Sequence, residues 1–253
     1  MASENSAGPP AERERLAHAV LDEPSRILKA MKIVDLLGRE RFLQAKRILE
    51  IGCGSGVIAS TLSKLGNPNV EVQAVDVEDN RIVYDGYGFT LVDGTTLPFE
   101  PGTFDIVISN HVIEHVGERD AQLHHLLEIS RVMTESGCVY LAVPNKWRLI
   151  EPHYRLPLLS WLPLGAADTY LRIAGKADHY DCIPLSARSA ERLFVDAGLR
   201  FQNLTLDAVY ATLRIEFADS KLGHALGRTP RALARLSAPI ISTLIYKLES
   251  TAA

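Results

Sequence analysis

The sequence predicts an α/β fold in which a mostly parallel sheet carries helices on both faces. Short apolar runs such as RILEI (47–51) and FDIVIS (104–109) alternate with helical segments such as residues 57–65 and 120–133. Strands that alternate with helices form βαβ crossovers, which place parallel strands between two helical layers. At 253 residues, the chain is also long enough to bury one full core without disulfides or metal ions.

Further elements follow the same alternation. Strands are expected at VEVQAVD (70–76), FTLVD (89–93) and CVYLAV (138–143). Ahead of the first strand, residues 26–37 carry apolar side chains at helical spacing, which predicts a helix over the sheet edge or over the mouth of a binding site. An open α/β sheet binds its ligand beyond the carboxyl ends of its strands, so the loops after these strands are the place to look for function.

The alternation stops after residue 144. Residues 146–184 are rich in proline and aromatic residues without a clear period, and they are expected to form an inserted lid over the active site. Beyond the lid, the sequence predicts a helix capped by Ser186 or Ser189 and ended by Gly198. We then expect a strand over residues 201–213, a helical connection over about 218–236 and a last strand over 242–249.

Residues 24–253 are expected to form one domain behind a disordered leader at residues 1–23, which is small, polar and contains prolines. Cys53, Cys138 and Cys182 lie far apart and form no CxxC pair. This spacing predicts neither a disulfide framework nor a zinc site, and it favours a cytoplasmic location.

Composition limits the possible partners. Charged residues make up 23% of the chain and the formal net charge is -4, so no positive field is available to hold nucleic acid. No apolar run approaches the length of a membrane span. The apolar stretch at 156–164 still permits peripheral membrane contact, although a buried lid is the preferred interpretation. The sequence does not indicate an oligomeric state.

Alternate glycines at Gly52, Gly54 and Gly56 follow the first predicted strand in RILEIGCGSG. A dinucleotide fingerprint would need its third glycine at position 57, which is Val57, and no Gly-Lys-Ser/Thr follows to make a phosphate-binding P-loop. Such a turn lets a ligand approach bare backbone, and Glu50 adds a carboxylate beside it. This combination suits a ligand with an ammonium group and a sugar better than a pyrophosphate.

Taken in order, the segments LEIGCGSG, VQAVD, LVDGTTLPF and FDIVISNHVIEHV resemble the motifs of the class I S-adenosylmethionine-dependent methyltransferases, of the small-molecule type similar to methyltransferase domain 11. The resemblance is tight from residue 47 to about 145 and rests beyond that only on element order. It implies a Rossmann-like, seven-stranded, mostly parallel sheet with an antiparallel last strand. It also implies S-adenosyl-L-methionine as the cofactor.

The resemblance assigns roles to individual residues. The first motif would contact the methionine part of the cofactor, Asp76 would accept from both ribose hydroxyls, and Asp93 would accept from the adenine amine while Gly94 leaves room for the ring. The full set of expected cofactor-binding residues is Glu50, Gly52, Cys53, Gly54, Gly56, Asp76, Val77, Asp93, Gly94, Asn110 and His115. The structural alternatives are that Asp76 caps a following helix, that Asp93 only begins a turn and that Cys53 only packs.

Two histidines are candidate general bases, because a methyl acceptor with a hydroxyl must lose a proton. His111 follows Asn110 at the end of the fourth predicted strand, and His153 lies in the lid. His115 is expected to orient or pack, and no metal-binding cluster is predicted. Aromatic lid residues would either line the pocket or form the lid's own core, and these are Trp147, Tyr154 and Trp161.

The predicted reaction is transfer of a methyl group to a small-molecule or lipid-like acceptor by in-line displacement, with oxygen or nitrogen as the expected methylated atom. The protein then mainly has to align the reactants and exclude water. Two alternatives remain open: a non-catalytic module that binds S-adenosylmethionine, and a nicotinamide-dependent oxidoreductase. The acceptor's identity and the need for a general base are also open.

Overall fold

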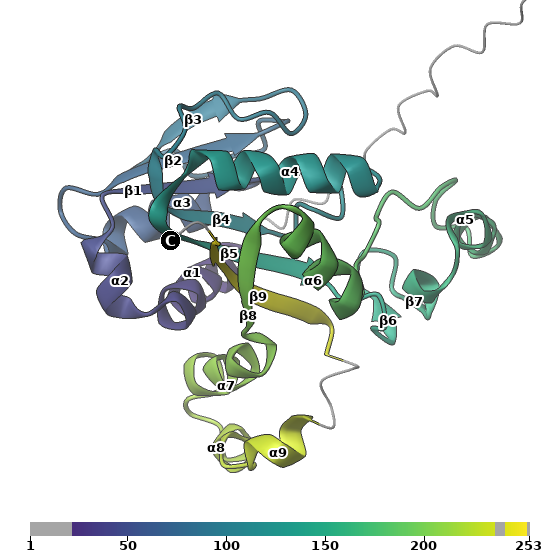
Figure 1. Ribbon diagram of the computed structural model, residues 1–253. Coiled ribbons are helices and arrows are strands. Elements are labelled where there is room, and N and C mark those ends of the chain that lie inside the picture. Colours follow the sequence, from purple (N-terminus) through teal and green to yellow (C-terminus); the bar gives the residue numbers. More distant parts are fainter. Residues whose placement is uncertain (1–21, 236–240, 252–253) are drawn as a thin grey trace, which may run out of the picture.

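The computed structural model describes residues 22–235 and 241–251. The predicted leader lies outside the described residues apart from Asp22, which is the N-cap residue of the first helix, and Glu23, which begins that helix. A seven-stranded sheet forms the centre of the molecule, in the order β3-β2-β1-β4-β5-β9-β8 (Figure 1). Its strands are β1 (Arg47–Ile51), β2 (Glu71–Asp76), β3 (Gly88–Leu91), β4 (Phe104–Asn110), β5 (Met133–Pro144), β8 (Leu199–Asn203) and β9 (Thr243–Ser250).

Strands β1 to β5 are mutually parallel, whereas β9 runs antiparallel to both β5 and β8. The predicted seven-stranded, mostly parallel sheet with an antiparallel last strand is therefore confirmed. The order places β1 and β4 at the centre of the sheet, next to each other. The chain reverses its direction of growth between these two strands, and such a switch point opens a crevice beyond their carboxyl ends.

Helices cover both faces of the sheet (Figure 1). They are α1 (Glu23–Leu37), α2 (Arg39–Gln44), α3 (Val57–Leu65), α4 (Arg119–Val132), α5 (Leu164–Ile173), α6 (Ala187–Asp196), α7 (Thr205–Ile215), α8 (Lys221–Gly227) and α9 (Arg231–Ala234). Successive residues of a strand point to opposite faces, so Leu49 joins one core with α4 and α6 while Ile48 joins a second core with α1, α3 and α7. None of the described helices is long and apolar enough to cross a bilayer.

The strand predicted over residues 201–213 was wrong over most of its length. β8 ends at Asn203, and the residues from Thr205 onward form α7 instead. The buried residues of α7 are Thr205, Ala208 and Ala211, whose spacing of three is helical, so packing overrides the strand preference of the valine, tyrosine and threonines in this segment. The amide of Thr205 donates to Asn203 Oδ1 at the junction.

The predicted lid packs around a small core of its own. It contains the two-stranded hairpin β6 (Ile150–Glu151) and β7 (Leu156–Pro157), the 3₁₀ turn Leu159–Trp161 and α5, at the right of Figure 1. Its core residues are Tyr154, Leu159, Ala167, Leu171, Tyr180 and Cys182. A buried ion pair between Arg148 and Glu151 joins this core. These contacts give the lid a fixed shape beside the sheet.

Candidate functional site

A cavity of about 650 Å³ opens beyond the carboxyl ends of the central strands. Its volume suits a nucleoside-sized ligand. The sheet contributes the ends of β1, β2 and β4 with the loops that follow, α1 contributes one wall, and the lid contributes Arg148, Pro152 and His153. Of the predicted site residues, those on the cavity wall are Glu50, Gly52, Cys53, Gly54, Asp76, Val77, Gly94, Asn110, His111, His115 and His153.

The glycine loop brings bare backbone to this cavity. Gly52 has φ 71°, a left-handed conformation that favours glycine, and a Cβ there would collide with the Val112 side chain. Gly56 does not line the cavity. It caps α3 with φ 76°, and a Cβ there would collide with the hydroxyl of Tyr87, so its role is to fit the loop against its neighbours. Gly52 and Gly54 therefore line the ligand cavity, whereas Gly56 lets the loop pack against its neighbours.

Asp76 ties the glycine loop to the end of β2. Its Oδ2 accepts from the Gly54 amide at 2.8 Å and its Oδ1 accepts from the Val77 amide at 2.8 Å. No helix follows β2, so the alternative role of helix cap does not apply. Each carboxylate oxygen has a second lone pair, which leaves Asp76 able to accept from two ligand hydroxyls at the cavity wall.

Glu50 is a buried carboxyl group at the base of the cavity. Burial, opposed by the amide of Ala59 and the positive charge of Arg26, raises its pKa from 4.5 to about 8. Its Oε2 has no hydrogen-bond partner among the described residues, and neither has Oδ1 of Asn110 on the same wall. A buried acceptor without a partner costs free energy, which a ligand donor such as an ammonium group would recover.

We expect Glu50→Gln to raise the free energy of unfolding, and by more at pH 8 than at pH 5. The raised pKa means that the folded state holds the Glu50 proton more tightly than the unfolded state, so wild-type stability falls as the pH rises from about 4.5 to about 8. The loss approaches about 1.4 kcal/mol per pH unit. Glutamine removes this dependence. Urea unfolding of both proteins at the two pH values measures it, and an equal difference at pH 5 and pH 8 would contradict the assignment.

Three cations on one face of α1 also line the cavity, and sequence reasoning missed them. They are Arg26, Lys29 and Lys32, spaced by three residues, so that one helix face presents them together. Burial and the neighbouring cations lower the pKa of Lys29 to about 8. Lys32 forms an ion pair with Glu216 on the same wall. Arg26 and Lys29, together with the buried carboxyl group of Glu50, complement an amino acid's carboxylate and ammonium groups.

The adenine ring is expected beside Asp93 and Gly94. Asp93 is exposed and is not part of the wall. The wall there consists of Val92, Gly94, Thr95 and Leu97, and the turn at Gly94 has φ 75°. An apolar and backbone surface for a flat ring is therefore present without the Asp93 side chain.

His111 stands at the end of β4 with φ 61°, an uncommon conformation for a residue with a side chain. Its Nδ1 lies 3.2 Å from Oε1 of Glu114, which is fully buried. Burial raises the pKa of Glu114, but the hydrogen bond from His111 and the charges of His111 and His115 outweigh it, so the pKa is lowered overall. An ionised Glu114 accepts the Nδ1 proton, which leaves Nε2 of His111 as the lone-pair nitrogen.

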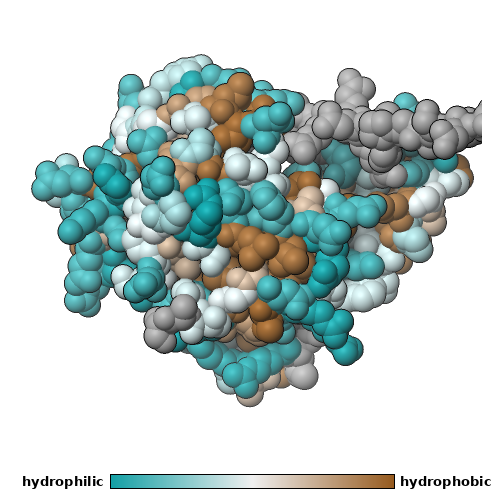
Figure 2. Space-filling view, turned by 45° about the horizontal axis from the view of Figure 1, so that its top comes forward, coloured by the Kyte–Doolittle hydropathy of each residue, from teal (hydrophilic) through white to brown (hydrophobic). Residues whose placement is uncertain are grey.

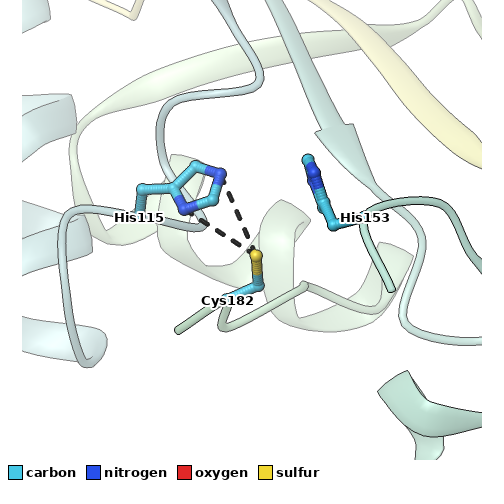
Figure 3. A group of neighbouring side chains, drawn as sticks. All are labelled: His115, His153 and Cys182. Carbon is cyan, nitrogen blue, oxygen red and sulfur yellow. Dashed lines mark hydrogen bonds between the residues drawn. The ribbon is translucent and has the colours of Figure 1, made fainter. Parts of the chain in front are cut away.

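His153 and His115 approach each other across the cavity mouth, with ring centroids 5.9 Å apart (Figure 3). Cys182 lies beneath them, and its Sγ is 3.7 Å from Nδ1 of His115. The sequence predicted no such cluster, because the three residues belong to segments that meet only in the folded chain.

The aromatic lid residues do not line the cavity. Tyr154 belongs to the lid core, where its hydroxyl donates to Asp181 at 2.9 Å. Trp161 donates its Nε1 proton to the carbonyl of Arg148, and Trp147 stacks edge-on against it. The lid-core interpretation holds for Tyr154, and the two tryptophans lie on the lid surface with partial exposure.

The residues on the wall fit S-adenosylmethionine at two of its three parts. Glu50, with its unpartnered oxygen, and the cations of α1 match the methionine end, and Asp76 matches the ribose. The adenine end would rest on Gly94, Thr95 and Leu97, beside the exposed Asp93.

Comparison with known proteins agrees with this geometry. The methyltransferase domain family matches residues 49–141. The ubiquinone biosynthesis O-methyltransferase of Pelagibacter ubique is 24% identical over 157 residues, which are 56% of this chain and 60% of that protein. The ubiquinone/menaquinone biosynthesis C-methyltransferase UbiE of Cupriavidus necator is 28% identical over 183 residues, which are 64% of this chain and 72% of that protein. The chain thus spans less than two thirds of the length of the O-methyltransferase.

Solved structures share the fold. An S-adenosylmethionine-dependent methyltransferase from Mesorhizobium loti superposes with a TM-score of 0.56 at 13% identity, covering 92% of this chain and 99% of that one. A second such enzyme, from Aquifex aeolicus, gives 0.50 at 19% identity, covering 72% of this chain and 86% of that one.

Proposed function

We propose that this chain, which has the class I S-adenosylmethionine-dependent methyltransferase fold, transfers a methyl group from S-adenosylmethionine to a hydroxyl of a small-molecule or lipid-like acceptor. The observation that carries the proposal is the convergence of Glu50, Asp76 and the His111–Glu114 pair on a single cavity. A nicotinamide-binding site would require neither a buried carboxyl group beside the loop nor a paired histidine.

The binding roles follow from the charges on the wall. Glu50 would accept from the ammonium group of the cofactor, and the cations of α1 would face its carboxylate. Asp76 would accept from the two ribose hydroxyls while its bonds to Gly54 and Val77 hold the loop in place. When bound, the cofactor supplies an activated methyl group on a sulfonium sulfur.

His111 would act as the general base. The carboxylate of Glu114 fixes its tautomer, so that Nε2 can take the proton from an acceptor hydroxyl as the oxygen becomes a nucleophile. The sulfonium needs no further activation, and the rest of the site has to align the acceptor and exclude water. Arg148, Pro152 and His153 close the cavity on the lid side.

The acceptor class rests on the size of the cavity and on the relatives. The cavity of about 650 Å³ suits small ligands, and the named relatives act in quinone biosynthesis. We therefore place this chain's acceptor among small hydroxyl compounds with an apolar part. All three cysteines are free, which suits a reducing cytoplasm.

Methyl-labelled S-adenosylmethionine, incubated with the purified protein and fractionated cell extract, tests the proposal. We expect label in the small-molecule or lipid fraction and none in protein or nucleic acid. Exclusive labelling of a macromolecular fraction would overturn the acceptor class. Binding of NADH in place of S-adenosylhomocysteine would overturn the reaction.

We further propose that the lid surface touches a membrane and so reaches a lipid-like acceptor. Its exposed apolar side chains include Trp147, Leu149, Ile150, Leu158 and Trp161. Apolar atoms are visible on the lid side of the molecule, at the right of Figure 2. Exposed tryptophans and aliphatic side chains together favour a membrane interface.

Ile150→Asp should weaken binding to phosphatidylcholine vesicles by about 10-fold or more, because Ile150 is 62% exposed and its burial in lipid would be lost. Vesicle sedimentation measures the partition. Leu91→Asp is the matched control, since Leu91 is comparably exposed on the edge strand β3, outside the lid. Equal partition of both variants and of the wild type would count against membrane contact by the lid.

A further inference from the structure

Three potential metal ligands meet where the lid joins the sheet (Figure 3). His115 lies in the loop after β4, His153 in the turn between β6 and β7, and Cys182 in the segment that leads from α5 to α6. Their ligand atoms all lie within 4.8 Å of one another. Three segments that are distant in sequence thus bring two imidazoles and one thiol to a single point.

We propose that His115, His153 and Cys182 bind a divalent transition metal ion, for which Zn²⁺ is the best chemical match. Imidazole and thiolate ligands suit Zn²⁺, whereas Mg²⁺ and Ca²⁺ prefer oxygen. Zn–N bonds of about 2.0 Å and Zn–S bonds of about 2.3 Å place the nitrogen and sulfur atoms of a tetrahedral site roughly 3.3 to 3.5 Å apart. The Sγ of Cys182 lies 3.7 Å from His115 Nδ1, close to that separation. The ligand atoms all lie within 4.8 Å of one another, so a movement of about 1 Å by His153 would complete the set.

His153 is the most exposed of the three ligands. It lies in the turn of the lid hairpin, whereas His115 is partly buried and Cys182 is buried in the lid core. The two more buried ligands would form the base of the site, and the exposed imidazole would close over the ion.

The charges around Cys182 favour a cation. Its Sγ lies 3.6 Å from Oδ1 of Asp181, and the carboxylates of Glu114 and Glu151 also act on it electrostatically. Arg148 is the opposing positive group. Three carboxylates face one guanidinium around the Cys182 sulfur, so the local field attracts a divalent cation.

The open coordination position would face the cavity. His115 and His153 both line the cavity wall, whereas Cys182 is fully buried behind them. Three protein ligands with one open position are typical of catalytic zinc sites. If the proposed function holds, on which this last step rests, an oxygen of the acceptor would occupy that position. His153 would then be a metal ligand and His111 the single general base.

Titration of the reduced, full-length protein with Co²⁺ tests the site without any assay of methyl transfer. We expect a thiolate-to-cobalt charge-transfer band that saturates at one equivalent and disappears when Zn²⁺ is added. Cys182→Ser should abolish the band. His153→Gln removes one imidazole ligand and should therefore weaken Co²⁺ binding by at least ~10-fold.

Cys138→Ala is the matched control, because Cys138 is an equally buried cysteine in β5. This variant should keep the band and the affinity. If Cys182→Ser does not fold, the Co²⁺ affinity of His153→Gln still tests the site, because His153 is exposed. The absence of a band in natively folded wild-type protein, or unchanged affinity in His153→Gln, would overturn the site. Methyl transfer by a protein that binds no metal would overturn this inference alone, whereas metal binding without transfer would overturn only the proposed function.

Discussion

His111→Asn should lower the rate of methyl transfer by about 10²- to 10⁴-fold, the range for loss of a general base, and leave the affinity for S-adenosylhomocysteine nearly unchanged. Asparagine is the appropriate replacement because His111 has φ 61°, which asparagine tolerates better than alanine does. Its amide can also donate to the buried Glu114 carboxylate, so the variant should fold. Initial rates and calorimetric affinities separate the two effects.

The matched control for this substitution is His224→Asn on α8. His224 is exposed and lies outside the cavity wall, so this variant should transfer methyl groups at the wild-type rate. A wild-type rate in His111→Asn would contradict the base assignment. It would point instead to an acceptor that is ionised before it binds.

Asp76→Ala should weaken cofactor binding by at least about 10²-fold. Two hydrogen bonds to a charged carboxylate contribute about 1.5 to 3 kcal/mol each, and both would be lost from the ribose. The amides of Gly54 and Val77 would also lose their acceptor, so the glycine loop would lose its connection to β2. Calorimetric titration with S-adenosylhomocysteine measures the change.

Asp79→Ala serves as the control for Asp76→Ala. Asp79 is an exposed acid in the same loop, paired with Arg81 and outside the cavity wall. Its replacement should leave the affinity for S-adenosylhomocysteine unchanged. Similar affinities in both variants would show that Asp76 does not hold the ribose.

Local spacing was sufficient to predict the five parallel strands and part of the site. Alternate glycines after an apolar strand, with an acid at the end of the next strand, placed Gly52, Gly54 and Asp76 on one cavity wall. Open sheets bind ligands at the carboxyl ends of their strands, and this rule predicted where in the fold these residues would form a binding site. The reversal of β9 followed from the family resemblance.

The residues that were missed depend on tertiary packing. The cations of α1 face the cavity only because that helix packs on α3 and α7, and the helical spacing of Arg26, Lys29 and Lys32 was the available signal. Glu114 lies three residues after His111, and this spacing was the available signal that the two side chains could pair. Cys182 had none, because its partners are distant in sequence and approach it only once the lid folds back on the sheet.

The strand predicted over residues 201–213 failed for a physical reason. The residues after β8 carry strand-forming side chains, yet the space above the sheet is filled by a helix whose small residues pack closely. Asp93 is exposed beside the cavity wall, and its expected bond to the adenine amine stays a prediction.

Calorimetric titration of the purified protein with S-adenosylhomocysteine, with NADH as the competing ligand, tests the central claim most directly. We predict one binding site per chain for S-adenosylhomocysteine, and no change in its affinity when NADH is present. Absence of binding by folded protein, or displacement by NADH, would contradict the assignment of this cavity to S-adenosylmethionine.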